Sequence, residues 1–527
     1  MKKLLSLLLV SAVLLTAFPL SVFAAEKTCD CPYAPIIYVR GRSDILADKD
    51  KAVNAEGNYV VPKTDDIDFL SLAKQIVPLY CKNYLKNDFS EFTQFVCDWA
   101  DETFAEFCLD NNGEITNNSG IVKALRWREN RLTDKHKPSS AVTTPKQASA
   151  ELYKYDYHYD FRLDPLETAD DLRDYVEAVK QVTGHQKVKF ITRCNGGVIL
   201  LTYFAKYGWD DVENVVFYNS IARGTAATDS VFTGNLWLSA QGTDYFAQQM
   251  LGDEPLYALI KDVVSLAKVT RLLDLLFAYF NKTVPRICTE ILPQGLLHSL
   301  ATSPGFWSMV AADHYDAARE LVFGGREEEY AGLLEKIDRY HEQVGCRIDE
   351  ILRQLGADVP VAFVYKYGFQ LYPVTEEPDR QSDTIVTCEQ QAPGTTTAPI
   401  GKTFSADYLT EQERLGNSAY LSADGSINAA TAFFPDTTWY IKDLTHDYFP
   451  SCVDELMYRF LRSNGEMTVF TEEKFPQFLT YSEENCEPKN GFLVPVTAAE
   501  TPNSVRSRSF FTVQRDLFRH LFQYMSK

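Results

Sequence analysis

One cysteine lies in a sequence context that is typical of a catalytic nucleophile. The segment Thr192-Arg193-Cys194-Asn195-Gly196-Gly197 follows an apolar run and precedes an apolar, helix-like stretch. A nucleophile elbow is a sharp strand-to-helix turn with a strained backbone, and it needs small residues where strand and helix approach closely. Gly196 meets this need and Thr192 meets it less well. The turn would place the Cys194 thiol at a helix N-terminus, which favours the thiolate. The same segment is also compatible with an ordinary turn around a structural cysteine.

A cysteine nucleophile needs a histidine base, and the base needs an acid that orients it. The histidines that follow Cys194 are His298, His314, His341, His446 and His520. His446 is the expected base, because it lies in a loop between a late strand and a helix. Asp424, on the turn of residues 422–426, is the expected acid. Its rivals are Asp436, Asp443 and Asp447.

An oxyanion hole requires two backbone N–H donors. Asn195, directly after the nucleophile, would supply one of them, and Arg42 in the loop after the first strand would supply the other. The sequence has no His-Glu-x-x-His motif and no phosphate-binding glycine loop, so we expect neither a metal nor a cofactor. Cys29-Asp30-Cys31 lacks partners at metal-site spacing, which favours a disulfide there.

The elements around these residues alternate between strands and helices. Short apolar or alternating runs predict strands over 35–39, 151–161, 188–192, 215–218, 359–365 and 438–441. Helices are expected from a cap at Thr168 to Gly184, over 198–207, and from 454 to 461. This order predicts an α/β fold with a mostly parallel sheet and helices on both faces.

The predicted organisation has several parts. Residues 25–43 form a first core segment with the oxyanion loop, 44–150 a helical insertion, 151–225 the α/β core, 226–355 a large helical cap, and 356–527 the C-terminal part of the core. We expect the cap to cover the site and to supply apolar wall from residues 272–280 or 306–307.

The N-terminus and the composition bear on location and partners. Residues 1–24 have the basic start, apolar stretch and small cleavage-site residues of a secretory signal peptide, so we expect export and no span in the mature chain. The formal charge of -20 argues against nucleic acid and anionic membranes as partners. Of the 11 cysteines, the ten besides Cys194 could pair, and export would permit their disulfides.

The chain resembles the lecithin:cholesterol acyltransferase-like branch of the α/β-hydrolase superfamily, which includes lipases, phospholipases and acyltransferases. The matching landmarks are Pro35 to Gly41, Tyr159-Asp160-Phe161-Arg162, Thr192 to Gly197, Ile221 to Thr225 with Thr233-Gly234-Asn235, Ser303 to Trp307, Tyr365 to Pro373, Asp424 to Asn428, and His446. The resemblance implies an α/β-hydrolase fold with Asp424 as acid and His446 as base. The chain departs from the family at Cys194, where the family has serine, and at Arg40, where it has histidine.

Two functions therefore compete. The first is an exported enzyme that transfers or hydrolyses the acyl group of an ester or lipid-type substrate through Cys194, His446, Asp424 and a thioester. The second is a non-catalytic secreted binding protein on a degenerate hydrolase fold.

Overall fold

The computed structural model of the chain describes residues 29, 31–41, 46–48, 69–104, 107–116, 119–121, 144–250, 255–371, 375, 379–482, 491–498 and 510–525. The expected signal peptide, residues 1–24, lies outside them.

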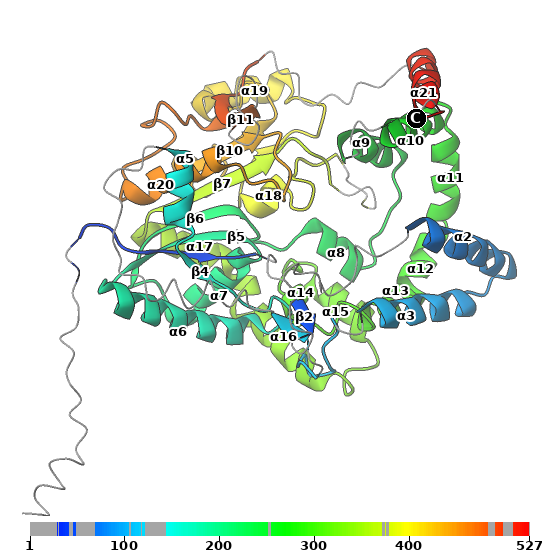
Figure 1. Cartoon of the computed structure of the whole chain (residues 1–527), viewed down its shortest axis with the longest axis horizontal. Helices are drawn as coiled ribbons and strands as arrows, with labels where there is room; N and C mark the ends of the chain where they lie inside the picture. The colour runs from blue at the N-terminus through cyan, green and yellow to red at the C-terminus, as the bar shows by residue number, and fades with distance from the viewer. Residues whose placement is uncertain are drawn as a thin grey trace, which may run out of the picture.

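An 8-stranded sheet lies at the centre of the molecule, in the order β12-β11-β10-β7-β6-β5-β1-β4 (Figure 1). Neighbouring strands run parallel except for the antiparallel pair β11–β12. The strands are β1 (Ile36–Val39), β4 (Tyr155–Tyr157), β5 (Val188–Cys194), β6 (Val212–Ser220), β7 (Val361–Tyr367), β10 (Thr438–Lys442), β11 (Phe478–Ser482) and β12 (Phe492–Pro495). Two small pairs lie apart from it: β2 (Leu46–Asp48) with β3 (Ser119–Ile121), and β8 (Thr396–Thr397) with β9 (Ile427–Asn428).

Helices cover both faces of this sheet. Along β1, Ile36 and Tyr38 face α5 (Pro145–Leu152) and α20 (Ser451–Arg462), whereas Ile37 and Val39 face the other layer. That layer consists of α6 (Pro165–Thr183), α7 (Gly196–Tyr207) and α17 (Ile348–Asp358). Because a strand buried on both faces can be apolar throughout, runs such as β6 carry no alternation. The predicted α/β class with a mostly parallel sheet is confirmed.

Two local expectations were wrong at their boundaries. Helix α6 begins at Pro165, with Asp164 as its N-cap accepting a hydrogen bond from Leu166 N–H, so Thr168 lies inside the helix. Proline at the first helical position fits because it has no N–H to leave unpaired. Within 151–161, only Tyr155–Tyr157 form a strand, since helix α5 runs to Leu152.

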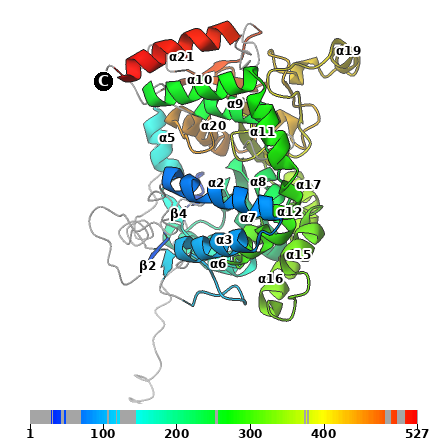
Figure 2. The ribbon, with the colours of Figure 1, turned by 90° about the vertical axis from the view of Figure 1, so that its right-hand side faces the viewer.

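Between β6 and β7 the described chain is helical, and many of these helices stand beside the sheet on the right of Figure 1. They are α8 (Ala226–Phe232), α9 (Ala240–Met250), α10 (Pro255–Val269), α11 (Leu272–Asn281), α12 (Val284–Glu290), α13 (Leu292–Leu297), α14 (Pro304–Trp307), α15 (Tyr315–Phe323), α16 (Ala331–Gln343) and the short η1 (Gly345–Arg347). Helices α2 (Phe69–Lys86) and α3 (Ser90–Phe104) pack against them, and the last helix, α21 (Phe510–Met525), lies along α10 (Figure 2).

Short elements complete the C-terminal half. They are α18 (Cys388–Gln391), α19 (Ala406–Arg414), η2 (Ser418–Tyr420) and η3 (Pro435–Thr437). None of the helices in the described part of the chain is long and apolar enough to cross a bilayer.

Candidate active site

Cys194 lies at the tip of a strained turn between β5 and α7. Its φ of 49° is in the left-handed region, which is uncommon for a residue other than glycine. Asn195 is the N-cap of α7, so the thiol lies beside the first turn of that helix. A strained backbone at this position is typical of a nucleophile elbow.

Two glycines make this turn sterically possible. A Cβ on Gly196 would lie 2.3 Å from Val39 O and 2.6 Å from Arg40 O, because α7 starts directly against the end of β1. A Cβ on Gly41 would lie 2.6 Å from the Cβ of Cys194. The small residues expected around the elbow are thus required by backbone approach on two sides.

His446 is buried and faces a carboxylate that the sequence analysis missed. Its Nδ1 lies 2.7 Å from Oδ2 of Asp383, and its backbone N–H donates to Asp383 O at 2.7 Å. The other oxygen of Asp383, Oδ1, accepts from Ile385 N–H at 3.0 Å and Val386 N–H at 2.8 Å. Burial by itself raises the pKa of Asp383, but His446 and these two N–H groups outweigh it, so the pKa is lowered. Asp383 is therefore held as an anion against the ring.

The loop that presents Asp383 follows β7 and has an unusual backbone. Phe369 and Ser382 pair through two backbone hydrogen bonds of 3.1 and 2.8 Å, which close the loop. Thr384 has a φ of 92°, a strained value for a β-branched residue. Such strain persists only where the surroundings impose it, and it clusters at functional sites.

The expected contact between Asp424 and His446 is not formed, since the carboxylate of Asp424 has other partners. Oδ1 of Asp424 accepts hydrogen bonds from Ser422 Oγ and Ser426 Oγ, both at 2.7 Å. Its Oδ2 lies 3.0 Å from Lys442 Nζ in a buried ion pair. The Asp-Gly turn thus satisfies its own carboxylate locally, and Asp383 occupies the position beside His446.

Cys194 and His446 are hydrogen-bonded to each other. Because Nδ1 faces Asp383, the remaining ring nitrogen, Nε2, is the one left for the thiol. Burial lowers the pKa of His446, but the charges of Asp383 and Cys194 outweigh it and raise the pKa well above 6.5. The imidazolium is therefore favoured at neutral pH, and it stabilises a thiolate on its neighbour in return.

Asn219 also contacts His446 from the end of β6. The pairing of β5 with β6 shifts register at Arg193/Cys194, and Asn219 has a φ of 50° there. Its Nδ2 donates to His446 O at 3.2 Å and lies 3.1 Å from His446 Nδ1. The irregularity thus turns a side chain of a central strand toward the site.

The thiol is bordered by apolar side chains from several parts of the chain. Cys194 packs, together with Met309 and Ile385, against a buried group made of Leu166, Val198, Ile221, Tyr340, Val344 and Val386. Met309, Tyr340 and Val344 belong to the region between β6 and β7. The segments expected to form this wall have other partners. Trp307 is buried within the helical region itself, and the ring of Phe280 packs at a tilt against Tyr80 of α2, with the ring centroids 5.2 Å apart.

A cavity of about 700 Å³ lies next to this apolar group, since Tyr340 belongs to both. Its lining includes the charged residues Arg223, Asp229, Arg380 and Glu389. Burial raises the pKa of Asp229 to about 6, against the lowering effect of a hydrogen bond from Ala311 N–H and of His314.

A buried lysine holds the loop that carries His446. Nζ of Lys366, on β7, donates to three backbone carbonyls: Thr445 O at 3.1 Å, His446 O at 3.0 Å and Tyr448 O at 2.8 Å. Three acceptors use all three N–H groups of an ammonium. The ring centroid of Phe449 lies 3.7 Å from Lys366 Nζ and 3.2 Å from the guanidinium carbon of Arg193. These contacts hold the loop of residues 445–449 against strand β7.

Lys366→Met should therefore lower kcat on the order of 10²-fold with little change in KM, because a displaced base is costly even when substrate binding persists. Lys189→Met is a matched control, since Lys189 is also buried on a parallel strand but lies at the opposite end of the sheet, 3.0 Å from Glu213. Both variants should lose stability, so turnover per folded molecule is the quantity to compare. Equal kcat in the two variants would contradict the role given to Lys366.

Of the two expected oxyanion donors, only Asn195 is among the described residues. Asn195 is the N-cap of α7 without a side-chain hydrogen bond, and its buried side-chain amide has no hydrogen-bond partner within the described part of the chain. Arg42 lies outside the described residues. Arg40, at the position of the family's histidine, is bound to Asp156, with Nε 2.6 Å from Oδ1.

The expected disulfides are not formed among the cysteines that the structure describes. These are Cys29, Cys31, Cys81, Cys97, Cys108, Cys194, Cys288, Cys346, Cys388 and Cys452, and none of them is in a disulfide. Burial raises the pKa of Cys108 and of Cys452 to about 12, so these two are thiols.

Comparisons with known proteins add little to this geometry. No protein-family model and no curated protein matches the chain. Among solved structures, the crystal structure of the Tle4-Tli4 complex is 12% identical, covers 64% of this chain and 75% of that chain, and has a TM-score of 0.23. A candidate aryl esterase from Burkholderia cenocepacia is 13% identical, covers 36% of this chain and 72% of its own, and has a TM-score of 0.12. Scores this low carry no argument about function. By its sheet, its elbow and its covering helices, the protein has an α/β-hydrolase-type fold.

Proposed function

We propose that this protein is a thiol-dependent hydrolase or acyltransferase, with Cys194 as nucleophile, His446 as base and Asp383 as the acid that orients the base. The observation that carries the proposal is the continuous chain of contacts from Asp383 through His446 to Cys194 at the end of β5. A base fixed by a carboxylate and bonded to a nucleophile on a strained turn is the arrangement that acyl transfer needs.

The reaction follows from these positions. The Cys194 thiolate attacks the carbonyl carbon of the substrate, and backbone N–H groups at the start of α7 stabilise the oxyanion. His446 then gives its proton to the leaving alcohol or amine, which leaves a thioester on Cys194. Water or a second acceptor, deprotonated by His446, attacks the thioester, and the thiolate is released with the acyl product.

The substrate we propose is a small acylated molecule with a polar part. The apolar group around Cys194 suits the acyl chain, and the charged cavity lined by Arg223, Asp229, Arg380 and Glu389 suits a polar leaving group or acceptor. The buried side-chain amide of Asn195, beside the nucleophile, can form a hydrogen bond with a polar atom of the substrate. Export directed by residues 1–24 is part of this proposal, and the exported protein should then begin near Ala25.

Cys194 should be acylated by activated esters such as p-nitrophenyl acetate and butyrate. Peptide mapping of quenched protein should find the acyl group on Cys194, and iodoacetamide should abolish ester turnover while serine-directed phosphonates leave it intact. Cys81 is a control, because it is exposed on α2 and does not line the cavity. Cys81→Ser should keep full turnover and Cys194→Ala should have none. A folded protein whose Cys194 takes up neither ester nor iodoacetamide would favour the binding-protein alternative.

A further inference from the structure

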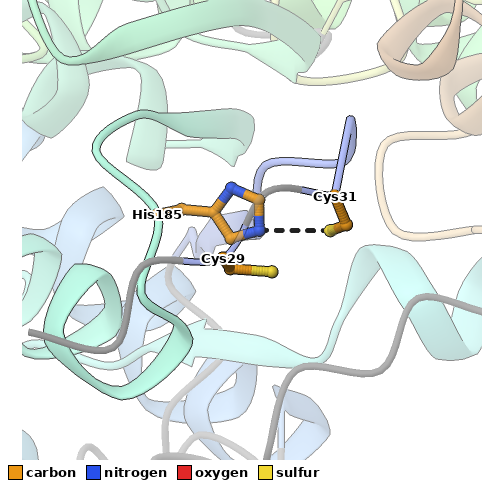
Figure 3. A group of neighbouring side chains, drawn as sticks. All are labelled: Cys29, Cys31 and His185. Carbon is orange, nitrogen blue, oxygen red and sulfur yellow. Dashed lines mark hydrogen bonds between the residues drawn. The ribbon is translucent and has the colours of Figure 1, made fainter.

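A second group of reactive side chains lies at the other end of β5. Cys29 and Cys31 come from the segment that leads into β1, and His185 comes from the turn between α6 and β5 (Figure 3). Strand β5 runs from Val188 to Cys194, so six steps of about 3.3 Å place this group roughly 20 Å from the nucleophile. The group therefore plays no part in the acyl transfer proposed above.

We propose that Cys29, Cys31 and His185 bind a zinc ion. Sγ of Cys31 lies 3.3 Å from Nε2 of His185, and the donor atoms of all three residues lie within 4.8 Å of one another. Zn–S bonds of about 2.3 Å and Zn–N bonds of about 2.0 Å in a tetrahedron place sulfur and nitrogen about 3.5 Å apart, and two sulfurs about 3.8 Å apart. The separation of Cys31 and His185 is thus already close to the value that one ion requires, and the donor atom of Cys29 lies within 4.8 Å of both.

The backbone holds the three ligands together before any ion binds. Gly184 ends α6 with a φ of 77°, which turns the chain at His185. Cys29 N–H donates to Gly184 O at 3.0 Å, and Lys189 N–H donates to Pro35 O at 2.8 Å. These bonds join the two segments on either side of the group. Preorganised ligands lower the cost of binding.

The ligand types select the metal and its role. Two thiolates and one imidazole suit zinc, whereas hard ions such as calcium and magnesium prefer oxygen. Binding releases the protons of both thiols to solvent. Three protein ligands leave a fourth position of the tetrahedron for water, since Cys29 and Cys31 are only half-buried. The ion would join the segment before β1 to the start of β5.

The test uses Co²⁺ as a spectroscopic probe for the zinc site in the full mature protein, reduced and freed of metal under argon. Co²⁺ should produce thiolate-to-cobalt absorption in the near ultraviolet and tetrahedral bands in the visible, and Zn²⁺ should remove both. Cys31→Ser and His185→Gln should each lose or shift these bands. Cys194→Ser and Cys346→Ser should keep them, which distinguishes the site from the nucleophile and from Cys346, whose Sγ lies 3.3 Å from His341 Nε2.

Zn²⁺ should also raise the Tm of the wild type but not of His185→Gln, because a ligand that binds only the folded state stabilises it. Absence of the cobalt bands from the wild type, or their persistence in both ligand variants, would overturn the proposal. So would a Cys29–Cys31 disulfide, found by peptide mapping, in protein loaded with Zn²⁺ and then exposed to air.

Discussion

Asp383→Asn should lower ester turnover by roughly 10³–10⁴-fold while the protein still folds, since loss of the acid leaves the imidazole in the wrong tautomer. Asparagine can still accept the hydrogen bonds from Ile385 and Val386 N–H through its Oδ1, so the loop should keep its shape. Only the acceptor of the His446 Nδ1–H bond is lost. The measurement is kcat/KM for a p-nitrophenyl ester, normalised to folded protein.

Asp424→Asn is the matched control, because it removes the other buried carboxylate that the sequence favoured. It breaks the ion pair with Lys442, so it should destabilise the fold by about 3 kcal/mol. Turnover per folded molecule should stay within a few-fold of wild type. A large loss of turnover in Asp424→Asn together with near wild-type turnover in Asp383→Asn would reverse the assignment of the acid.

His446→Gln should slow alkylation of Cys194 at pH 6 by on the order of 10²-fold. The raised pKa of His446 keeps the wild-type ring protonated at this pH, and the cation maintains the thiolate. Without it Cys194 becomes an ordinary thiol with a pKa near 8.5, of which only about 0.3% is thiolate at pH 6. The wild-type rate should therefore stay high as the pH falls from 8 to 6, whereas the variant's rate should drop about tenfold per pH unit.

The rate at each pH can be followed by mass spectrometry of the Cys194 peptide with iodoacetamide as reagent. Peptides with the exposed Cys81 and Cys346 provide internal references, because both thiols are free and distant in sequence from the changed residue. Coincident pH profiles for Cys194 in the wild type and in His446→Gln would show that the two side chains are not electrostatically coupled.

The strand–turn–helix around Cys194 and the loop position of His446 could be predicted from the sequence because both depend on local order. A strand, a turn with glycine and an apolar helix are contiguous around Cys194, and His446 lies in the loop directly after strand β10. The carboxylate that contacts His446 could not be found in this way. Asp424 has a local motif, an Asp-Gly turn, but that motif satisfies its own carboxylate. Asp383 reaches His446 only through a loop closed by the Phe369–Ser382 pairing, a tertiary feature without a sequence signature.

Other differences have the same origin. The alternation over 151–161 is real, yet packing of α5 against α20 extends the helix to Leu152 and shortens the strand. The grouping of Cys29 and Cys31 with His185 could not be predicted from the sequence either, because Cys31 and His185 lie 154 positions apart. Contacts of this range are set by the sheet order and not by neighbouring residues.

The last helix has a practical consequence for experiments on movement. Helix α21 is joined to α10 through packing and through the contact of His520 Nδ1 with Asp262 Oδ2 at 2.6 Å, so the C-terminal end of the chain is attached to the helices beside the sheet (Figure 2). A fluorophore placed at the C-terminus would therefore travel with those helices. Paired with a second dye at an exposed position of α6, it would report any movement of those helices relative to the sheet without any alteration near Cys194.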